Sequence, residues 1–195
     1  MGVKFTSPFT MCVNPSAPPG KSQRYAKPER ERRFLLARRP AGSVEKTTLI
    51  VDRYLLGTRL RLRQMIETQG TSTSTYYKLT QKVPAPDGGP GLLSTTYLNV
   101  EEYTLLATLP AAVLRKTRYS VPLFGIDAYS APLSGLFLGE VEFDDDAEMN
   151  TFNPPPWIVA EVTLDSLFTG GHLSTMQSGD LIGLLSAFGL HPIAS

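Results

Sequence analysis

Paired acidic residues stand among basic residues near the start of the chain, in residues 28–40 with the sequence PERERRFLLARRP. Side chains alternate between the two faces of a β-strand, so Glu29, Glu31 and Arg33 would share one face. Two carboxylates two residues apart repel each other, and a buried face tolerates them only when a positive charge compensates them. That charge could be a divalent cation or Arg33, or the face could be exposed to solvent and carry incidental charges.

The same chemistry recurs later in the chain. Glu140 and Glu142 repeat the spacing of the two acids within residues 136–143. Basic side chains also share strand faces, and they are Arg61 and Arg63, Lys82, and Lys116 and Arg118. A surface lined by both sets would bind a polyanion through its cations and a divalent metal ion through its acids.

The length and charge of the chain narrow the class of protein. A chain of 195 residues with 42% apolar residues predicts one domain with a sizeable core. The net charge is only +1, yet residues 21–39 hold eight Lys or Arg and residues 140–148 hold six acids. Because the bases fall at alternating positions rather than in an outward-facing run, we expect no nucleic-acid partner.

Cysteine and histidine are too few for the common metal and disulfide frameworks. Cys12 is the single cysteine, and His172 and His191 lie late in the chain, away from other ligand-like clusters. No apolar run approaches the ~18 residues of a membrane span. The first twenty residues lack the apolar region of a signal peptide. We therefore expect a cytoplasmic protein with no membrane partner.

The residue pattern divides the chain into a leader and one folded domain. Residues 1–26 are rich in Pro and Ser and predict a flexible leader, and residues 27–195 form the domain. Alternating patterns predict eight strands, at residues 28–40, 46–56, 59–65, 76–83, 92–100, 112–121, 124–129 and 136–143. Loops are expected at 71–75 and 84–91, and helices at 101–109 and 178–188, with an acidic turn or short helix at 144–150.

The predicted elements favour a mainly β (α+β) fold built from antiparallel strands and short helices. Several strands carry charge on one face and apolar side chains on the other. This pattern fits a barrel whose lumen is charged, and it also fits an ordinary sheet with one solvated face. Composition alone does not separate the two.

The motifs, in their order along the chain, resemble the CYTH domain of the triphosphate tunnel metalloenzymes and, within it, the short bacterial inorganic triphosphatases. The matching segments are Glu29-x-Glu31-x-Arg33, Asp52-Arg53-Tyr54-Leu55, Arg61-x-Arg63, residues 79–82, Lys116-Thr117-Arg118-Tyr119, Ile126-Asp127, Glu140-x-Glu142, residues 154–157 and Glu161-x-Thr163. The resemblance covers roughly residues 28–175. It implies a closed eight-stranded antiparallel barrel that forms a charged tunnel, with short flanking helices.

The resemblance also implies a metal-dependent hydrolase of triphosphate compounds, with inorganic triphosphate as the expected small-molecule substrate and Mg²⁺ or Mn²⁺ as cofactor. Carried over by position, the implied metal ligands are Glu29, Glu31, Asp127, Glu140 and Glu142. The implied phosphate ligands are Arg33, Arg61, Arg63, Lys82 and Arg118, together with Lys116. Tyr54 and Lys116 match the pair that prepares the attacking water.

Two departures from the family pattern bear on this prediction. Arg33 stands where the signature has lysine, which keeps the charge but changes a point donor into a fork. Thr95 and Tyr97 stand in the fifth strand where family members commonly carry acids. Glu101 or Glu102 could replace those acids only in a shifted register.

Other functions stay open at this point. A non-catalytic polyphosphate- or nucleotide-binding module is favoured by the missing acids of the fifth strand and opposed by Tyr54 and Lys116. Thiamine triphosphatase and class IV adenylyl cyclase are further alternatives within the family, although the His-containing segment of the cyclases is absent from the sequence. The oligomeric state, a homodimer included, is left open.

Overall fold

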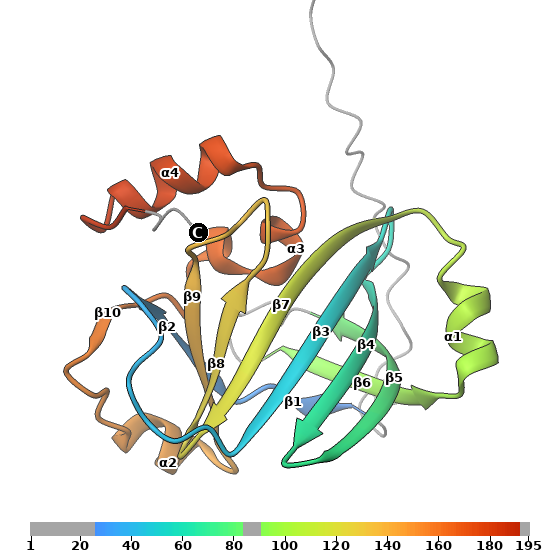
Figure 1. Cartoon of the computed structure of the whole chain (residues 1–195), viewed down its shortest axis with the longest axis horizontal. Helices are drawn as coiled ribbons and strands as arrows, with labels where there is room; N and C mark the ends of the chain where they lie inside the picture. The colour runs from blue at the N-terminus through green and yellow to red at the C-terminus, as the bar shows by residue number, and fades with distance from the viewer. Residues whose placement is uncertain (1–25, 84–90, 192–195) are drawn as a thin grey trace, which may run out of the picture.

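The computed structural model describes residues 26–83 and 91–191. The predicted leader at 1–26 therefore lies outside the described residues except for Ala26, and the predicted loop at 84–91 does so except for Gly91. The described chain forms one antiparallel sheet with short helices (Figure 1), so the expectation of a mainly β fold is confirmed.

The elements follow the predicted order closely. The strands are β1 (Lys27–Pro28), β2 (Glu31–Leu36), β3 (Lys46–Leu55), β4 (Leu60–Gln69), β5 (Ser72–Val83), β6 (Leu92–Leu98), β7 (Ala111–Val121), β8 (Phe124–Tyr129), β9 (Phe137–Glu142) and β10 (Ile158–Glu161). The helices are α1 (Val100–Leu106), α2 (Asp146–Thr151), the 3₁₀ turn η1 (Ser166–Phe168), α3 (Gly170–Leu173) and α4 (Ser178–Ser186).

The loop expected at residues 71–75 is instead part of β5. Gly70 has a φ of 57°, a left-handed conformation that glycine adopts without steric cost, and it makes the tight turn between β4 and β5. Thr and Ser then pair with β4 from Ser72 onward, opposite Gln69. The Ser/Thr run indicated a loop by composition, but cross-strand pairing with β4 makes it a strand.

The sheet is not a closed eight-stranded barrel, so that expectation was wrong. Its ten strands run in the order β1-β6-β5-β4-β3-β7-β8-β9-β2-β10, which leaves β1 and β10 as edges. The first predicted strand is split at Glu29 and Arg30, so that β1 pairs with β6 while β2 pairs with β9 and β10. The late strand β10 pairs with β2 along Phe34, Leu35 and Leu36. Within the described ranges, β2 does not pair with β6.

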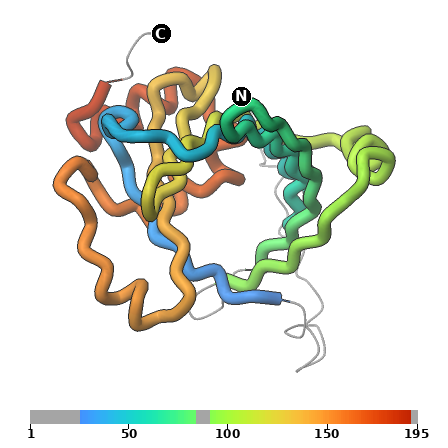
Figure 2. The backbone as a smooth tube through the Cα atoms, turned by 60° about the horizontal axis from the view of Figure 1, so that its bottom comes forward, coloured from blue at the N-terminus to red at the C-terminus, as the bar shows by residue number. Residues whose placement is uncertain are grey.

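The sheet is strongly curved (Figure 2). The residues on one face of β2 indicate which side chains line the concave side of the sheet. Glu31, Arg33 and Leu35 alternate onto the same face, opposite Glu142, Glu140 and Leu138 of β9 in the antiparallel register. The concave side is therefore charged toward the start of β2 and apolar toward its end.

The C-terminal segment covers the apolar half. Leu35 and Leu138 pack in a buried cluster with Phe168 of η1, Leu173 of α3 and Leu181 of α4. A second cluster on the other face is built from aromatic and aliphatic residues, namely Phe34, Leu36, Phe124, Ile126, Val141 and Phe143. The first cluster therefore lies beside the charged residues on the same face of β2 and β9, and the second covers the opposite face.

Helix α1 begins with a capping box. The Asn99 side chain accepts from the Glu102 backbone N–H at 2.8 Å, and the Glu102 carboxylate accepts from the Asn99 N–H at 2.8 Å. Glu102 therefore caps α1.

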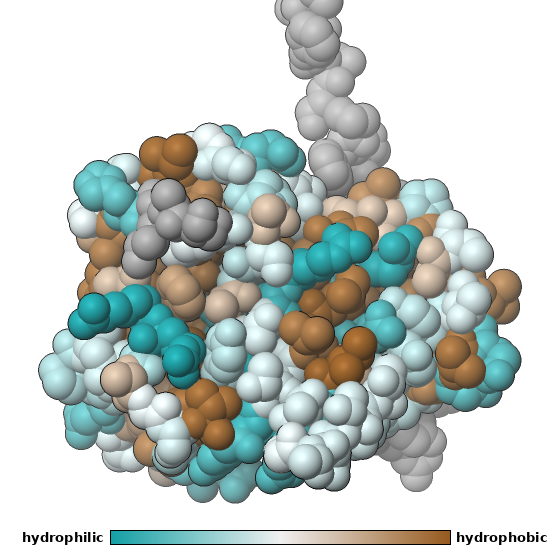
Figure 3. All heavy atoms as spheres, in the orientation of Figure 1, coloured by the Kyte–Doolittle hydropathy of each residue, from teal (hydrophilic) through white to brown (hydrophobic). Residues whose placement is uncertain are grey.

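The face of the molecule in Figure 3 mixes hydrophilic and hydrophobic residues in small groups. None of the described helices is long and apolar enough to cross a membrane.

Candidate functional site

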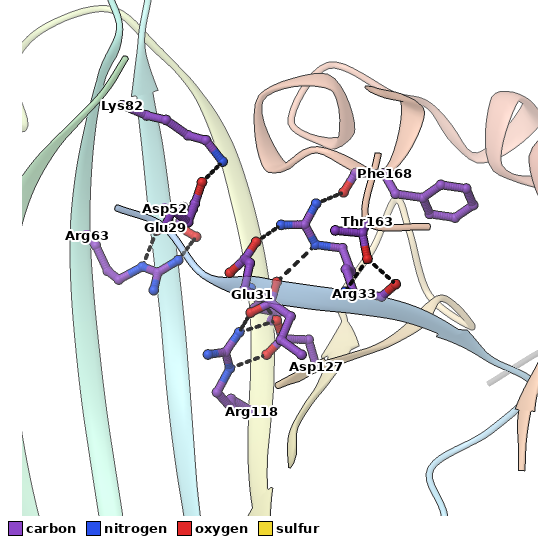
Figure 4. A network of polar contacts seen from close by, with 12 residues as sticks. Glu29, Glu31, Arg33, Asp52, Arg63, Lys82, Arg118, Asp127, Thr163 and Phe168 are labelled. Carbon is purple, nitrogen blue, oxygen red and sulfur yellow. Dashed lines mark hydrogen bonds and ion pairs between the residues drawn. The ribbon is translucent and has the colours of Figure 1, made fainter. Parts of the chain in front are cut away.

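Charged side chains form ion pairs on the concave side of the sheet (Figure 4), in one series that joins β2, β7, β8 and β9 and in a separate set on β3 and β4. Arg33 of β2 is central and only 9% exposed. It donates to Glu31, to Glu140 Oε1 at 3.2 Å and to the Phe168 carbonyl at 3.4 Å. Its backbone N–H also donates to Thr163 Oγ1 at 3.0 Å. Arg33 thus joins the predicted acids to the C-terminal segment.

A second group lies on β3 and β4, where Asp52 is fully buried. Arg63 donates to both carboxylate oxygens of Asp52, from Nε to Oδ1 at 2.5 Å and from Nη2 to Oδ2 at 2.8 Å. Arg61 Nε lies 3.7 Å from Asp52 Oδ1. Asp52 lies in one of the matching sequence motifs, but the motif alone predicted no role for it. The structure makes it the counter-ion that holds two predicted phosphate ligands on the concave side.

A third group joins β7, β8 and β9. Asp127 is fully buried, and both of its oxygens accept hydrogen bonds from Arg118, each at 2.7 Å, while Lys116 also donates to it. Arg118 continues to Glu140. Gly125 leaves room for this guanidinium, because a Cβ there would come within 3.1 Å of Arg118 Cδ. The proposed metal role of Asp127 stays a prediction, and in this arrangement its oxygens are engaged by cations.

Tyr54 and Lys116, the predicted catalytic pair, do not lie opposite each other in the β3–β7 pairing. Lys116 lies opposite Ile50 of β3, four residues from Tyr54, which is about 13 Å along a strand. Lys116 lies 5.5 Å from the Tyr129 ring centre. Burial raises the pKa of Tyr54 to about 12, and Asp52 adds to the rise while Arg61 and Arg63 oppose it. The Tyr54 hydroxyl therefore stays protonated at neutral pH.

Glu29, Glu142 and Lys82 lie at the more open part of the site. Lys82 forms an ion pair with Glu29, and its side chain is 49% exposed. Glu142 is exposed and lies opposite Glu31 in the β2–β9 pairing. The structure therefore brings these three predicted residues next to the main network, where Lys82 and Glu142 have more solvent around them and the Glu29 side chain is only 17% exposed.

Lys78 belongs to the same surface, although the sequence motifs did not single it out. It lies opposite Arg63 in the β4–β5 pairing. Burial lowers its pKa, and Arg63 and Arg61 lower it further because like charges repel the ammonium. Its alternation with Lys82 on one strand face was the signal that could have identified it.

The fifth predicted strand, β6, presents no acid to this surface within the described residues. Thr95 lies opposite Thr80, and their hydroxyl oxygens are 3.1 Å apart. Tyr97 lies opposite Lys78, whose ammonium is 5.7 Å from the ring centre, and the tyrosine is 69% exposed. Glu102 caps α1, so a shifted register does not restore the missing acids.

The acids of the site are suited to a hard divalent cation. Burial raises the pKa of Glu31 to about 7, and Glu140 and Glu29 add to the rise because their negative charges disfavour its ionisation. Although burial opposes it, Arg118, Lys116 and Arg33 hold the pKa of Glu140 well below its usual range. A cation would relieve the crowding around Glu31, and carboxylate oxygens are the donors that Mg²⁺ prefers. Among the described residues, no group of three or more Asp, Glu, Cys or His side chains is placed to hold a metal ion.

Replacing Lys82 with alanine should lower the free energy of unfolding by less than about 1 kcal/mol, because the half-exposed pair with Glu29 is screened by solvent. Urea unfolding measures the difference. Lys46→Ala removes a comparable, partly exposed pair with Glu67, at 3.0 Å, and serves as the control. A loss several times larger than that of the control would contradict the expectation.

Comparisons with known proteins place the chain in a family. No family model matches the chain. A curated relative, the inorganic triphosphatase of Nitrosomonas europaea, is 34% identical over 152 residues, which cover 72% of this chain and 92% of the relative. The crystal structure of the hypothetical protein NE1496 is similar with a TM-score of 0.50 and 29% identity, and covers 76% of this chain and 99% of that one. A crystal structure of the inorganic triphosphatase NE1496 has a TM-score of 0.49 and 28% identity, over 76% of this chain and 95% of that one.

The fold and the site together define a class of proteins in which a curved antiparallel sheet carries a network of basic and acidic side chains on its concave side. Within that class, the chain belongs to the CYTH-like inorganic triphosphatase family. This finding confirms the family resemblance drawn from the ordered sequence motifs.

Proposed function

We propose that this protein hydrolyses triphosphate compounds, with inorganic triphosphate as the substrate and Mg²⁺ or Mn²⁺ as the cofactor. The observation that carries the proposal is the convergence of buried or half-buried cations on one side of the sheet, each oriented by a carboxylate. These cations are Arg33, Arg61, Arg63, Lys116 and Arg118. Similarity to a curated inorganic triphosphatase supports the same substrate.

The arrangement suits phosphoryl transfer, because this reaction depends mainly on positioning and on stabilising charge. Guanidinium forks match phosphate oxygens with two parallel hydrogen bonds. Buried Asp52 and Asp127 would hold Arg63 and Arg118 in place before the substrate arrives. The substrate would therefore be gripped with little reorganisation of the site.

Arg61 is the cation best placed to contact phosphate. Its Nε is buried and has no hydrogen-bond partner within the described residues. An unpartnered buried donor is costly, and an anionic ligand would satisfy it. In contrast, two of the N–H donors of Arg63 already form hydrogen bonds to Asp52.

The proposed metal ligands are Glu31 and Glu140, with Glu29 and Glu142 at the open side and Asp127 behind Arg118. A divalent cation bound there would neutralise charge on the phosphate oxygens. Glu31 and Glu140 would then share their negative charge between that cation and Arg33.

Tyr54 and Lys116 are the proposed catalytic residues. With its pKa near 12, the Tyr54 hydroxyl would act as a neutral donor that orients a water molecule or a phosphate oxygen rather than as a base. Lys116, held by its ion pair with Asp127, would add positive charge beside the negative charge that develops on the phosphate oxygens.

Arg61→Ala should weaken binding of inorganic triphosphate by about 1.5 to 3 kcal/mol, the range for a hydrogen bond to a charged group. Isothermal titration calorimetry without divalent cation measures this loss directly. Arg38→Ala removes the same charge from an exposed position and is the matched control. Equal affinities of the two variants would argue against Arg61 as a phosphate ligand.

The function itself is tested by measuring phosphate released from inorganic triphosphate, pyrophosphate, thiamine triphosphate and ATP, with Mg²⁺, with Mn²⁺ and with a chelator. The proposal expects release from inorganic triphosphate that the chelator abolishes. Cyclic AMP from ATP, or preferred hydrolysis of thiamine triphosphate, would point to the other family activities.

A second candidate is a non-catalytic polyphosphate- or nucleotide-binding module. Thr95 and Tyr97 favour it, because β6 contributes no acid to the concave side within the described residues and a metal site could be weakened there. Tight binding of inorganic triphosphate without phosphate release under any cation would support this candidate. The cytoplasmic location, the absence of a nucleic-acid or membrane partner and the leader at 1–26 stay predictions.

A further inference from the structure

The C-terminal segment touches the site at one unusual contact. Tyr54 points from β3 toward the start of α3, where its hydroxyl lies against the backbone of Gly170. A Cβ added at Gly170 would lie 1.9 Å from Tyr54 Oη and 2.9 Å from Tyr54 Cζ, whereas ordinary Cβ contacts are 3.4 Å or longer. The hydroxyl therefore occupies the space that a side chain at position 170 would need.

The requirement for glycine at position 170 comes from Tyr54 and not from the backbone. Gly170 is absent from the glycines with positive φ, which are Gly57, Gly70, Gly135 and Gly189. Its backbone conformation is therefore open to alanine. All three of the nearest atoms to the added Cβ belong to Tyr54. Larger residues are thus excluded at this position by one side chain of the site.

The surroundings leave little freedom for either partner to move. The Tyr54 ring packs against the buried cluster that includes Phe168 and Leu173. The segment before α3 is tied to β2, because Arg33 donates to the Phe168 carbonyl and to Thr163 Oγ1. A side chain at 170 would therefore displace the tyrosine ring or separate the segment from the sheet.

We propose that Gly170 is a positioning residue that sets the location of the Tyr54 hydroxyl relative to the phosphate-binding cations. The absence of a side chain at 170 lets α3 approach β3 closely at Tyr54, which lies opposite Arg61 in the β3–β4 pairing and two residues from Asp52. This inference rests on the proposed function only for its effect on turnover. The contact between Gly170 and Tyr54 is independent of it.

The test compares Gly170→Ala with Gly171→Ala. Gly171 is the next residue of the same short helix, and a Cβ there would meet Tyr54 only at 4.0 Å, which is ordinary contact. Gly170→Ala should lower kcat for inorganic triphosphate by about 10- to 100-fold, because small misplacements of a reacting group have effects of that size. KM should change little, and Gly171→Ala should behave like wild type.

A double-mutant cycle with Tyr54→Phe identifies the hydroxyl as the route of the effect. In the Tyr54→Phe background, Gly170→Ala should add little further loss of kcat, because the hydroxyl is already absent. The loss of Tm caused by Gly170→Ala should also be smaller in that background, since the 1.9 Å clash is gone. Independent, additive effects on kcat and Tm would overturn the proposal, as would wild-type kcat in Gly170→Ala.

The Tm measurements separate the positioning role of Gly170 from the proposed triphosphatase function. If wild type released no phosphate from inorganic triphosphate, the proposed function would fail, while a coupled loss of Tm would still support the contact that positions Tyr54. If wild type is active and the two changes act independently on Tm and kcat, Gly170 has no positioning role although the proposed function stands.

Discussion

Asp52→Ala should lower the free energy of unfolding by about 3 to 5 kcal/mol, the cost of breaking a buried ion pair from one side. Asp52 is 0% exposed and accepts two hydrogen bonds from Arg63, which is itself only 8% exposed. Without the carboxylate, Arg63 stays charged and unpaired among buried neighbours. Urea unfolding at neutral pH measures the loss.

The same variant reports on the anion site. Inorganic triphosphate should raise the Tm of Asp52→Ala by more than it raises the Tm of wild type, because the ligand supplies the negative charge that Arg61 and Arg63 have lost. Glu67→Ala, which removes the partly exposed partner of Lys46, is the control and should cost less than about 1 kcal/mol. A cost for Asp52→Ala no larger than that of the control would refute the role of Asp52 as the essential counter-ion.

Glu31→Gln should remove a pH-dependent penalty on stability of up to about 3 kcal/mol, the free energy of a pKa rise from 4.5 to about 7. Burial and the neighbouring Glu140 and Glu29 cause the rise. Between pH 4.5 and about 7, the unfolded chain releases this proton while the folded chain retains it. Wild type should therefore lose stability as the pH rises through this interval and remain at the lower value above it.

Urea unfolding in the presence of a chelator, at pH 4.5 and at pH 8, tests this expectation. Glu31→Gln should be more stable than wild type at pH 8 and about equal to it at pH 4.5. The exposed Glu45→Gln is the control and should follow wild type at both values. The same Glu31→Gln variant should lose cation-dependent phosphate release. The Glu31 carboxylate would thus lower the stability of the fold and still be required for the proposed activity. An unchanged difference between wild type and Glu31→Gln at the two pH values would count against the raised pKa.

The sequence by itself determined the identity of most strands and of the charged surface. Alternation with period two depends only on local side-chain geometry, so the residue pattern alone predicts the shared face of Glu31 and Arg33 and that of Arg61 and Arg63. The ordered motifs carried the family resemblance, which the comparison with a known relative confirmed. The helix near the C-terminus was also predictable, because its apolar residues recur at helical spacing.

Only the tertiary structure decided how these strands are joined and which charges meet. The pairing of β10 with β2 joins residues more than 120 positions apart, and the split at Glu29 and Arg30 depends on the pairing of β1 with the distant strand β6. These long-range contacts leave the sheet open where the motifs implied a closed barrel. The burial of Asp52 beneath Arg63 depends on the hairpin register.

The contact between Tyr54 and Gly170 has the same origin. It joins residues that are far apart in the sequence, and it exists because the C-terminal segment folds back onto β3. A glycine in the run Thr169-Gly170-Gly171 carries no sequence signal that distinguishes it from its neighbour. The distances of 1.9 Å and 4.0 Å from the added Cβ atoms to Tyr54 make that distinction, because steric exclusion depends on the packed chain and not on residue type.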